Sequence, residues 1–431
     1  MRSELPTAHE TDLHIFRSTL GTHIFLADGS RIYDLDPEFA SQIGTVSAVN
    51  VASQNPLWEA LGLFSDNTLS RYIDGQSLKP PPLASISLNV AQSCNMSCGY
   101  CYADTGRFGG KSRLMSLDIA RASVDRLIAE SDPSVGIVIG YMGGEPLLNR
   151  TVIHETTRYA FNAAARAGRS VRFALTTNAT LLNGEDAELF AEFPFTVAIS
   201  IDGNREINDA VRRMNNESSS YDQLCKGLNL LNSYGRPNHL AARVTVTPKS
   251  GELVPILDSV LGLGFDEVGF SAVQVSPDST LAFSPEHFPV FLARMISCGQ
   301  KALGELAAGR TYPFSNLETA LQEIHRGSHR PYPCGAGAAY MSANAEGNLF
   351  ACHRLIDDPQ FLMGSVQTGS DIRARSEHLA RNHVDLMEPC NQCWARYLCG
   401  GGCYHEVSRR GRVGCDYIRG WLHFCLQAYV E

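Results

Sequence analysis

The sequence predicts an α/β fold whose central parallel sheet is flanked by a small N-terminal unit and a cysteine-rich C-terminal unit. From residue 85 onward, six strand-like segments alternate with amphipathic segments of helical length, which is typical of a parallel sheet. The proline-rich run at 79–82 indicates a stiff linker before this sheet. Eight of the 13 cysteines lie between residues 334 and 425. At 431 residues the chain is long enough for two or three domains.

Composition is that of an ordinary globular protein. The chain is 44% hydrophobic and 19% charged, with a formal net charge of −9 and no long basic run. This charge gives no electrostatic reason to expect nucleic acid as a partner. The first residues lack a signal-peptide pattern and no apolar stretch approaches membrane-spanning length, so we expect a cytoplasmic protein without a membrane partner. In a reducing compartment, clustered cysteines indicate metal or redox chemistry rather than disulfides.

The N-terminal unit is predicted to span residues 1–84 and to have an α+β fold. Alternating apolar residues over 13–36 are interrupted at Gly21-Thr22 and Asp28-Gly29, which favours a β-hairpin or meander. Helical patterns follow at 37–44 and 55–64.

The parallel unit is predicted over residues 85–284. Helix-length amphipathic runs separate its strands, and six strands are too few for a complete eight-stranded barrel, so a partial barrel or an open sheet is expected. In either form, ligands collect at the C-terminal ends of the strands. A helical bridge over 285–330 then leads to the C-terminal unit, 331–431. The strand candidates are 85–90, 136–141, 171–176, 196–201, 243–247 and 267–272.

Three cysteines follow the first strand with the spacing Cys94-x3-Cys98-x2-Cys101. Iron–sulfur clusters are normally held by four cysteines, so a tight set of three can hold three corners of a four-iron cluster and leave one iron free. A structural zinc ion is the alternative, but zinc takes four ligands and no fourth candidate residue is near. The spacing therefore favours a cluster with one reactive iron.

Small polar residues end the next three strands. Gly143-Gly144-Glu145-Pro146 follows the second strand, Thr176-Thr177-Asn178 the third, and Ser200-Ile201-Asp202-Gly203 the fourth. Hydroxyl, amide and carboxylate groups suit the recognition of a ribose and an amino acid. The alternative for any single set is an ordinary turn or the N-cap of the next helix. Together with the cysteines they make four such sets at successive strand ends, which favours a ligand site.

These motifs together resemble the signature of the radical S-adenosylmethionine (SAM) enzymes, over residues from about 85 to 431. The resemblance implies a partial (β/α)6 TIM-like barrel in which amino and carboxylate groups of SAM chelate the free iron of a 4Fe–4S cluster. It also implies that one electron from the cluster splits SAM, and that the resulting 5′-deoxyadenosyl radical takes a hydrogen atom from the substrate.

The resemblance also implies which residues contact SAM. Arg212, after the fourth strand, is a candidate partner for the SAM carboxylate because a guanidinium fork fits that group; a solvated surface arginine is the alternative. The other implied contacts are Gly143, Gly144 and Glu145 for the methionyl amine, Ser200 and Asp202 for the ribose and carboxylate, and Tyr100 for the adenine.

The C-terminal cysteines resemble the SPASM extension of radical SAM enzymes that modify peptides. The segment between Cys334 and Cys352 reads as two short strands around a turn at 344–347, and such a hairpin brings both thiols together. A zinc ribbon is the alternative, although seven thiolates exceed one tetrahedral zinc site. The resemblance implies two auxiliary 4Fe–4S clusters besides the SAM-binding one, the first held by Cys334, Cys352 and Cys403, the second by Cys390, Cys393, Cys399 and Cys415.

This assignment leaves one iron of the first auxiliary cluster without a cysteine. No cysteine occurs between 334 and 352 to fill the vacancy, and an open iron can bind a substrate thiolate. Cys425 is an alternative fourth ligand, or an alternative to Cys415 in the second cluster. We expect Cys415 to be the ligand because its segment better resembles the family's closing segment, and Cys425 to be a buried thiol.

The sequence also bears on the reaction. Sulfatase-activating members of the family carry an aspartate after the cysteine that matches Cys352, whereas this chain has His353, which argues against formylglycine formation. The runs CYADTGRFGG, CGAGAAY and ACHR resemble the SCIFF maturases and the maturase of quinohemoprotein amine dehydrogenase, which join a cysteine sulfur to a carbon of another residue. We therefore expect thioether crosslinking within a peptide or small protein subunit.

Other classes of function stay open on sequence alone. One is a different radical modification of a peptide, such as carbon–carbon crosslinking, epimerisation or sulfatase-type formylglycine formation, and another is a non-catalytic iron–sulfur or zinc scaffold. The expected partners are a precursor peptide, whose leader segment adds as a strand to the N-terminal unit, and a low-potential electron donor such as flavodoxin or ferredoxin.

Overall fold

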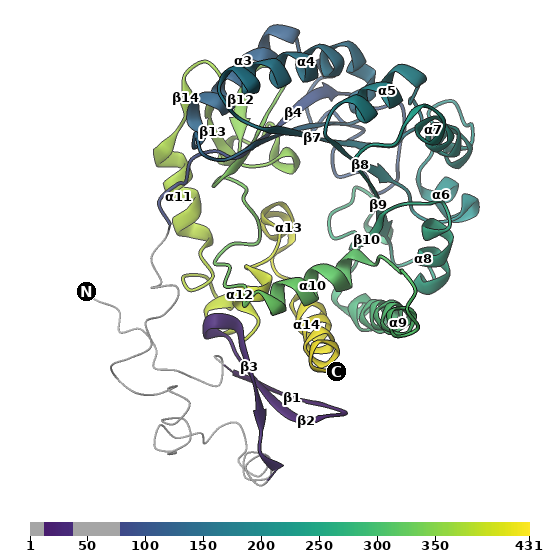
Figure 1. Ribbon diagram of the computed structural model, residues 1–431, viewed down its shortest axis with the longest axis vertical. Helices are drawn as coiled ribbons and strands as arrows, with labels where there is room; N and C mark the ends of the chain where they lie inside the picture. The colour runs from purple at the N-terminus through teal and green to yellow at the C-terminus, as the bar shows by residue number, and fades with distance from the viewer. Residues whose placement is uncertain (1–12, 38–77) are drawn as a thin grey trace.

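The computed structural model describes residues 13–37 and 78–431, and a curved parallel sheet forms its centre (Figure 1). The sheet order β10-β9-β8-β7-β6-β4 joins neighbours in parallel register throughout. All six predicted strands are therefore present, with ends shifted by at most four residues. They are β4 (Ser85–Gln92), β6 (Ile137–Gly143), β7 (Val171–Thr177), β8 (Phe195–Ser200), β9 (His239–Val246) and β10 (Glu267–Ala272).

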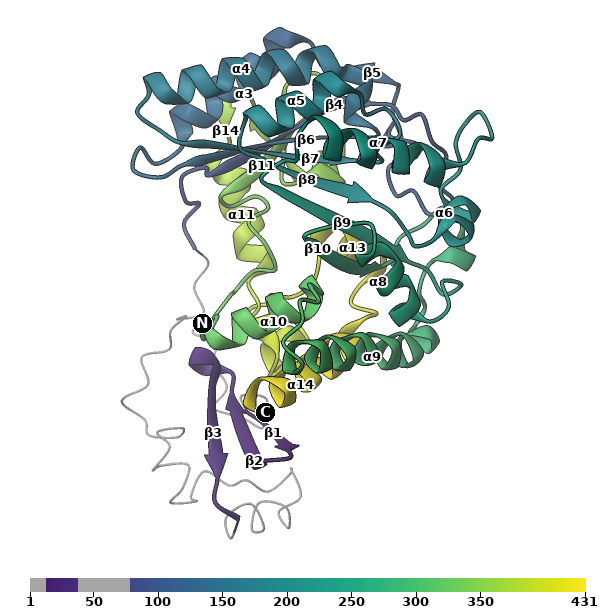
Figure 2. The ribbon, with the colours of Figure 1, turned by 45° about the vertical axis from the view of Figure 1, so that its right-hand side comes forward.

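Helices cover the outer face of this sheet (Figures 1 and 2). Side chains cap several of them; Asn183, for example, forms a reciprocal capping box with Asp186 at the start of α5. The helices are α3 (Leu117–Glu130), α4 (Arg150–Arg166), α5 (Gly184–Glu192), α6 (Arg205–Val211), α7 (Ser220–Tyr234) and α8 (Leu253–Leu261).

Alternation along the strands separates a large-residue face from a small-residue face. Tyr141, Phe173 and Phe195 are fully or almost fully buried, and the rings of Phe173 and Phe195 stack at 5.2 Å. Successive side chains of a strand point to opposite faces, so the neighbours that alternate with these aromatics along each strand point to the inside of the curved sheet. Near the strand ends that inner face carries small side chains such as Thr176 and Ser200, which leaves room for a ligand.

The predicted C-terminal hairpin is present, and it extends the central sheet. β11 (Tyr340–Ala343) pairs antiparallel with β12 (Asn348–Phe350) around the predicted turn, where Gly347 has a φ of +85°. The sequence did not predict that β11 also pairs in parallel with β4. This pairing joins the cysteine-rich region directly to the strand that precedes Cys94. Three short strands complete the sheet: β5 (Arg113–Leu114), β13 (Leu362–Ser365) and β14 (Gly369–Ser370).

Helices also connect and complete the C-terminal region. Asn316 on α10 covers the far edge of the sheet, because its side chain accepts from the Phe270 amide (2.7 Å) and donates to the Phe270 carbonyl (3.0 Å). The predicted helical bridge is found as α9 and α10. The helices are α9 (Phe288–Ala307), α10 (Ser315–His325), α11 (Ile372–Asn382), α12 (Arg396–Cys399), α13 (Tyr404–Arg410) and α14 (Cys415–Val430).

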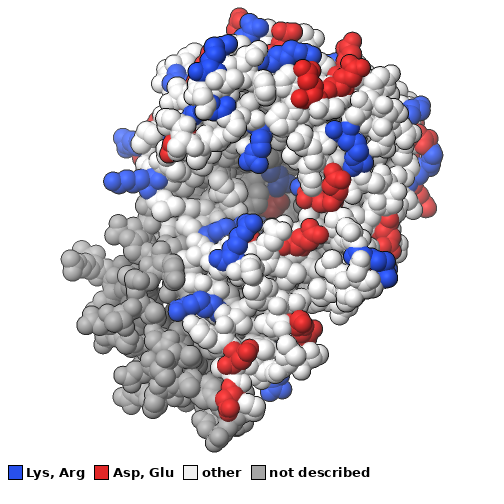
Figure 3. Space-filling view, in the orientation of Figure 1, with Lys and Arg blue, Asp and Glu red and all other residues white. Residues whose placement is uncertain are grey.

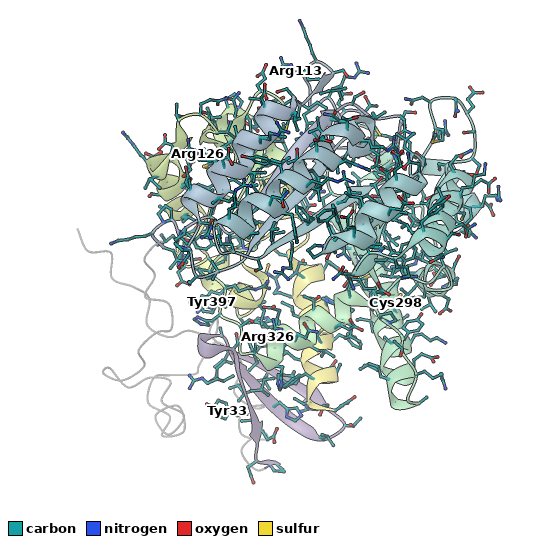
Figure 4. All side chains as sticks on the ribbon, turned by 45° about the horizontal axis from the view of Figure 1, so that its top comes forward. Tyr33, Arg113, Arg126, Cys298, Arg326 and Tyr397 are labelled. Carbon is teal, nitrogen blue, oxygen red and sulfur yellow. The ribbon has the colours of Figure 1, made fainter. Side chains whose placement is uncertain are left out.

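The predicted N-terminal meander is a three-stranded antiparallel sheet of β1 (Leu13–Ser18), β2 (Gly21–Leu26) and β3 (Arg31–Leu35). It packs against α14, where His14 bonds to His423 (2.8 Å), and the His14 ring also stacks on Trp394 (3.9 Å), which precedes α12. Figure 4 shows Tyr33 on β3 at the opposite end of the molecule from Arg113 on β5. The helices predicted at 37–44 and 55–64 lie almost wholly outside the described residues, and the domain boundaries stay predictions.

The described residues contain no helix that combines the length and the apolar character needed to span a membrane. On the face in Figure 3, basic and acidic side chains are interspersed, and the surface is hollowed near its centre.

Candidate active site

The loop that carries Cys94, Cys98 and Cys101 leaves the C-terminal end of β4 and is held on two sides. On one side the end of β6 continues the sheet pairing, because the Gly144 amide donates to Ala91 O and the Glu145 amide to Ser93 O, both at 2.8 Å. On the other side the Ser97 amide donates to Arg213 O (2.8 Å) and the Gly99 amide to Val211 O (3.0 Å). The backbone of the chain therefore fixes the cysteine loop from both flanks.

The glycines at and after the end of β6, Gly143 and Gly144, are required by this contact. A Cβ atom on Gly143 would lie 2.4 Å from Ala91 O, and one on Gly144 would lie 2.4 Å from Ser93 O. Gly143 also has a φ of +157°, where other residues are rare. These glycines thus let the backbone of β6 approach the cysteine loop.

A cavity of about 390 Å3 opens beside the three cysteines. Most of the residues predicted to contact SAM line it, whereas Glu145 and Asp202 do not. The predicted residues in its wall are Cys94, Cys98, Tyr100, Cys101, Gly143, Gly144, Thr177, Asn178, Ser200 and Arg212.

Glu145 is fully buried and binds the protein itself. Its carboxylate accepts hydrogen bonds from the Thr177 hydroxyl (2.7 Å), the Asn178 amide (2.8 Å) and the Leu147 amide (3.0 Å). Burial nevertheless raises its pKa. This side chain therefore joins the ends of β6 and β7, and it does not face the cavity as its predicted contact with the methionyl amine requires.

Asp202 is also buried, in a polar chain with Tyr100 and Arg212. The Tyr100 hydroxyl donates to Asp202 (2.5 Å) and accepts from Arg212 (2.7 Å), and the Thr245 amide donates to the other oxygen of Asp202 (2.9 Å). Burial opposes the charge of Arg212, but Tyr100, Cys98 and Asp202 hold its pKa well above its usual value. Arg212 is only 6% exposed, so it is not a solvated surface arginine.

Asn178 contacts the cysteine loop directly. Its side-chain amide donates to Asn95 (3.0 Å) and lies 3.9 Å from Cys94 Sγ. Burial, together with the nearby Glu145 carboxylate, raises the pKa of the Cys94 thiol to about 12. A bound metal ion would have to displace that proton.

Several cavity residues were not predicted. Thr245 and Ser271 come from the ends of β9 and β10, and the strand-end rule applied to the first four strands would have found both. His353 and Arg354 come from the cysteine-rich region and directly follow Cys352. No local pattern marks these two, since their position depends on the pairing of β11 with β4.

The grouping of the C-terminal cysteines into two sets stays a prediction, and the electrostatic neighbours of Cys352 and Cys399 accord with it. Burial, with smaller contributions from the neighbouring Cys403 and Cys334 thiols, raises the pKa of Cys352 to about 12. In the second set, burial raises the pKa of Cys399 to about 11, with further contributions from Cys390, Cys393 and Cys415.

Cys425 stands apart from both sets. It is fully buried, and burial alone accounts for its raised pKa, whereas Cys390 and Cys393 contribute to the raised pKa of Cys415. Within the described residues no three His, Cys, Asp or Glu side chains converge as ligands of a single metal ion. The predicted sets of three and four thiols would fit polynuclear iron–sulfur clusters better than one zinc ion.

Comparison with known proteins bears on the three-cysteine loop. Residues 88–252 match the Radical SAM superfamily. A cysteine-type anaerobic sulfatase-maturating enzyme of Clostridium novyi is 28% identical over 343 residues, covering 73% of this chain and 86% of that protein.

Two solved structures show the likeness of fold. Native anSMEcpe with bound AdoMet has a TM-score of 0.70 and 17% identity, and the match covers 81% of this chain and 98% of that one. SuiB of Streptococcus suis bound to precursor peptide SuiA has a TM-score of 0.55 and 14% identity, with 94% and 97% covered. The three-cysteine loop at the end of β4 and the family match over 88–252 together identify this chain as a radical SAM enzyme, of a superfamily that binds a 4Fe–4S cluster and SAM.

Proposed function

We propose that this enzyme modifies a precursor peptide or small protein subunit by forming a thioether bond between a cysteine sulfur and a carbon of another residue. One observation carries the proposal: a single cavity is lined both by the three cysteines after β4 and by His353 and Arg354, which follow Cys352. A substrate side chain in this cavity therefore lies beside both cofactor sites. Two similar proteins, a sulfatase-maturating enzyme and SuiB with its precursor peptide, support a peptide or protein substrate.

Three 4Fe–4S clusters are proposed as cofactors. When bound, the first would supply the electron that cleaves SAM, and the auxiliary clusters would supply an open iron for substrate sulfur and a path for electrons. Their proposed ligands are Cys94, Cys98 and Cys101 for the first, Cys334, Cys352 and Cys403 for the second, and Cys390, Cys393, Cys399 and Cys415 for the third.

The proposed roles of the cavity residues follow from their contacts. Arg212 binds the SAM carboxylate with the part of its guanidinium group that does not contact Tyr100. Ser200 faces the ribose, and the Tyr100 ring packs beside the adenine. Glu145 and Asp202 act indirectly, because each holds another residue of the site in position.

The proposed partners are a leader peptide and an electron donor. β3 lies at the edge of the three-stranded sheet, and a peptide strand can add to such an edge through backbone hydrogen bonds. The electron donor is proposed to be a low-potential flavodoxin or ferredoxin.

Mass spectrometry tests the thioether. The enzyme is coexpressed with a small cysteine-containing open reading frame that neighbours its gene. We expect the peptide to lose the mass of two hydrogen atoms per crosslink and its cysteine to resist alkylation. A peptide of unchanged cysteine reactivity contradicts the thioether. A product that reacts with a hydrazide probe indicates a carbonyl group and hence the sulfatase-type reaction.

Iron content distinguishes the two candidate ligands near the C-terminus. Three complete clusters correspond to about twelve irons per chain. We expect Cys415→Ser to lower the iron content by up to about four, because a cluster with three cysteine ligands is less tightly held. Cys425→Ser is the matched control, since it changes the same atom on the same helix. It is expected to keep the iron and to lower stability by about 1–3 kcal/mol, because it buries a hydroxyl. Iron loss in Cys425→Ser but not in Cys415→Ser would show that Cys425, and not Cys415, is the cluster ligand.

A further inference from the structure

We propose that Arg354 raises the reduction potential of the first auxiliary cluster. The inference rests on the proposed function, because it assumes that Cys334, Cys352 and Cys403 hold that cluster. In the structure their Sγ atoms stand in for the thiolates that would bind iron.

Arg354 donates to two of the three sulfur atoms. Its backbone amide lies 3.3 Å from Cys352 Sγ, and its Nη1 lies 3.5 Å from Cys403 Sγ. One residue therefore brings an amide dipole and a full positive charge to the same cluster site. Among the hydrogen bonds of the described residues, no other side chain donates to Cys334, Cys352 or Cys403.

Two neighbours hold the guanidinium group in place, and a third residue holds one of them. It lies over the Tyr102 ring, 4.7 Å from the ring centre, and Nη1 also donates to Glu406 (2.8 Å). Glu406 in turn accepts from Gln274, which follows β10 (2.9 Å). The position of the charge is thus fixed by the loop after Cys101, by α13 and by the end of the central sheet.

The sign of the effect follows from electrostatics. Reduction adds one negative charge to the cluster, so a fixed cation and N–H donors at its sulfurs stabilise the reduced state more than the oxidised one. Arg354 is 31% exposed and Glu406 only 15%, so solvent screens the interaction only in part. Glu406 is an anion beside the same cation, and it must offset part of the effect.

The location gives this tuning a consequence. Arg354 lines the cavity that also contains Cys101, so it lies between the SAM-binding site and the first auxiliary site. A raised potential makes the auxiliary cluster the better electron acceptor of the two. A substrate bound in this cavity would lie beside Arg354 and so near that acceptor.

A redox titration of the reconstituted full-length enzyme, followed by electron paramagnetic resonance, tests the proposal. We expect Arg354→Gln to lower the midpoint of one cluster by about 59 mV, which is a tenfold change for one electron and the lower end of what a charged hydrogen bond contributes. Arg354→Lys keeps the charge and should retain part of the shift. Glu406→Gln should move the same midpoint upward. The shifted midpoint is assigned to the first auxiliary cluster if Cys352→Ser, which removes a proposed ligand of that cluster, abolishes the same reduction step.

Arg409→Gln is the matched control. Arg409 lies on α13, next to the cluster site, and pairs with Asp358 (2.8 Å), but it has no hydrogen bond to a cysteine in the described structure. Equal midpoints in Arg354→Gln and Arg409→Gln overturn the proposal, as does a downward shift in Glu406→Gln. If the wild-type enzyme lacks the first auxiliary cluster, its iron content falls to about eight per chain. That result overturns the proposed cofactor set as well, whereas full iron without a shift overturns only the role of Arg354.

Discussion

Replacing Cys98 with alanine is expected to reduce the cleavage of SAM to background while the fold and both auxiliary sites persist. Cys94, Cys98 and Cys101 are the three thiols at the cavity, and a cluster left with two cysteines is not retained. Iron content should fall from about twelve to about eight per chain. The backbone contacts of the loop do not involve the Cys98 side chain, so stability should change little.

The measurement is 5′-deoxyadenosine formed from SAM with dithionite as reductant, together with iron and sulfide content. Cys225→Ala is the control, because Cys225 is a half-buried thiol on α7 outside all three cysteine sets. It should keep full cleavage and full iron. Cleavage by Cys98→Ala at a tenth of the wild-type rate or more would contradict the assignment of this loop.

The central sheet was predictable because its signals are local. Each strand is a short apolar segment that alternates with a helix-length amphipathic segment, and all six appear within a few residues of their predicted ends. Cysteine spacing is local too, and it places Cys94, Cys98 and Cys101 in one loop that lines the cavity, whereas the two C-terminal sets stay a prediction from spacing and family resemblance.

Side-chain direction was not predictable in the same way. Glu145 and Asp202 belong to the predicted motifs, yet both point into the protein and hold other residues in position. A motif gives the type of residue at a strand end, whereas its orientation depends on which neighbours offer hydrogen bonds. For Glu145 those neighbours are the Thr177 hydroxyl and the Asn178 amide, 32 and 33 residues away.

Contacts between segments that are distant in the sequence were the second feature that could not be predicted. The pairing of β11 with β4 joins residues about 255 apart, and it brings Arg354 to the cavity. The stacking of His14 on Trp394 likewise joins the first described strand to the cysteine-rich region. Neither contact has a periodic signal, because each depends on the packing of complete elements.

Replacing Arg212 with methionine is expected to weaken both the fold and the binding of SAM, and a second substitution separates the two effects. Removing the guanidinium group leaves Asp202 buried without its cation, which should cost about 3–5 kcal/mol of unfolding free energy. Burial already raises the pKa of Asp202, and loss of Arg212 removes the cation that lowers it. An acid whose pKa is raised in the folded state binds more protons there, so the variant should gain stability as the pH falls.

The double variant Arg212→Met/Asp202→Asn tests this reasoning. Because an amide replaces the buried charge, urea unfolding should show recovery of most of the lost stability and loss of the added pH dependence. SAM affinity should not recover, since the carboxylate of SAM still lacks its proposed guanidinium partner, and calorimetry should show binding weakened by about 10- to 100-fold. Tyr100→Phe removes only the hydroxyl between Arg212 and Asp202, and it should lower stability by less than Arg212→Met does. If the double variant binds SAM as tightly as the wild-type enzyme, Arg212 serves only to neutralise Asp202, and another cavity residue must hold the SAM carboxylate.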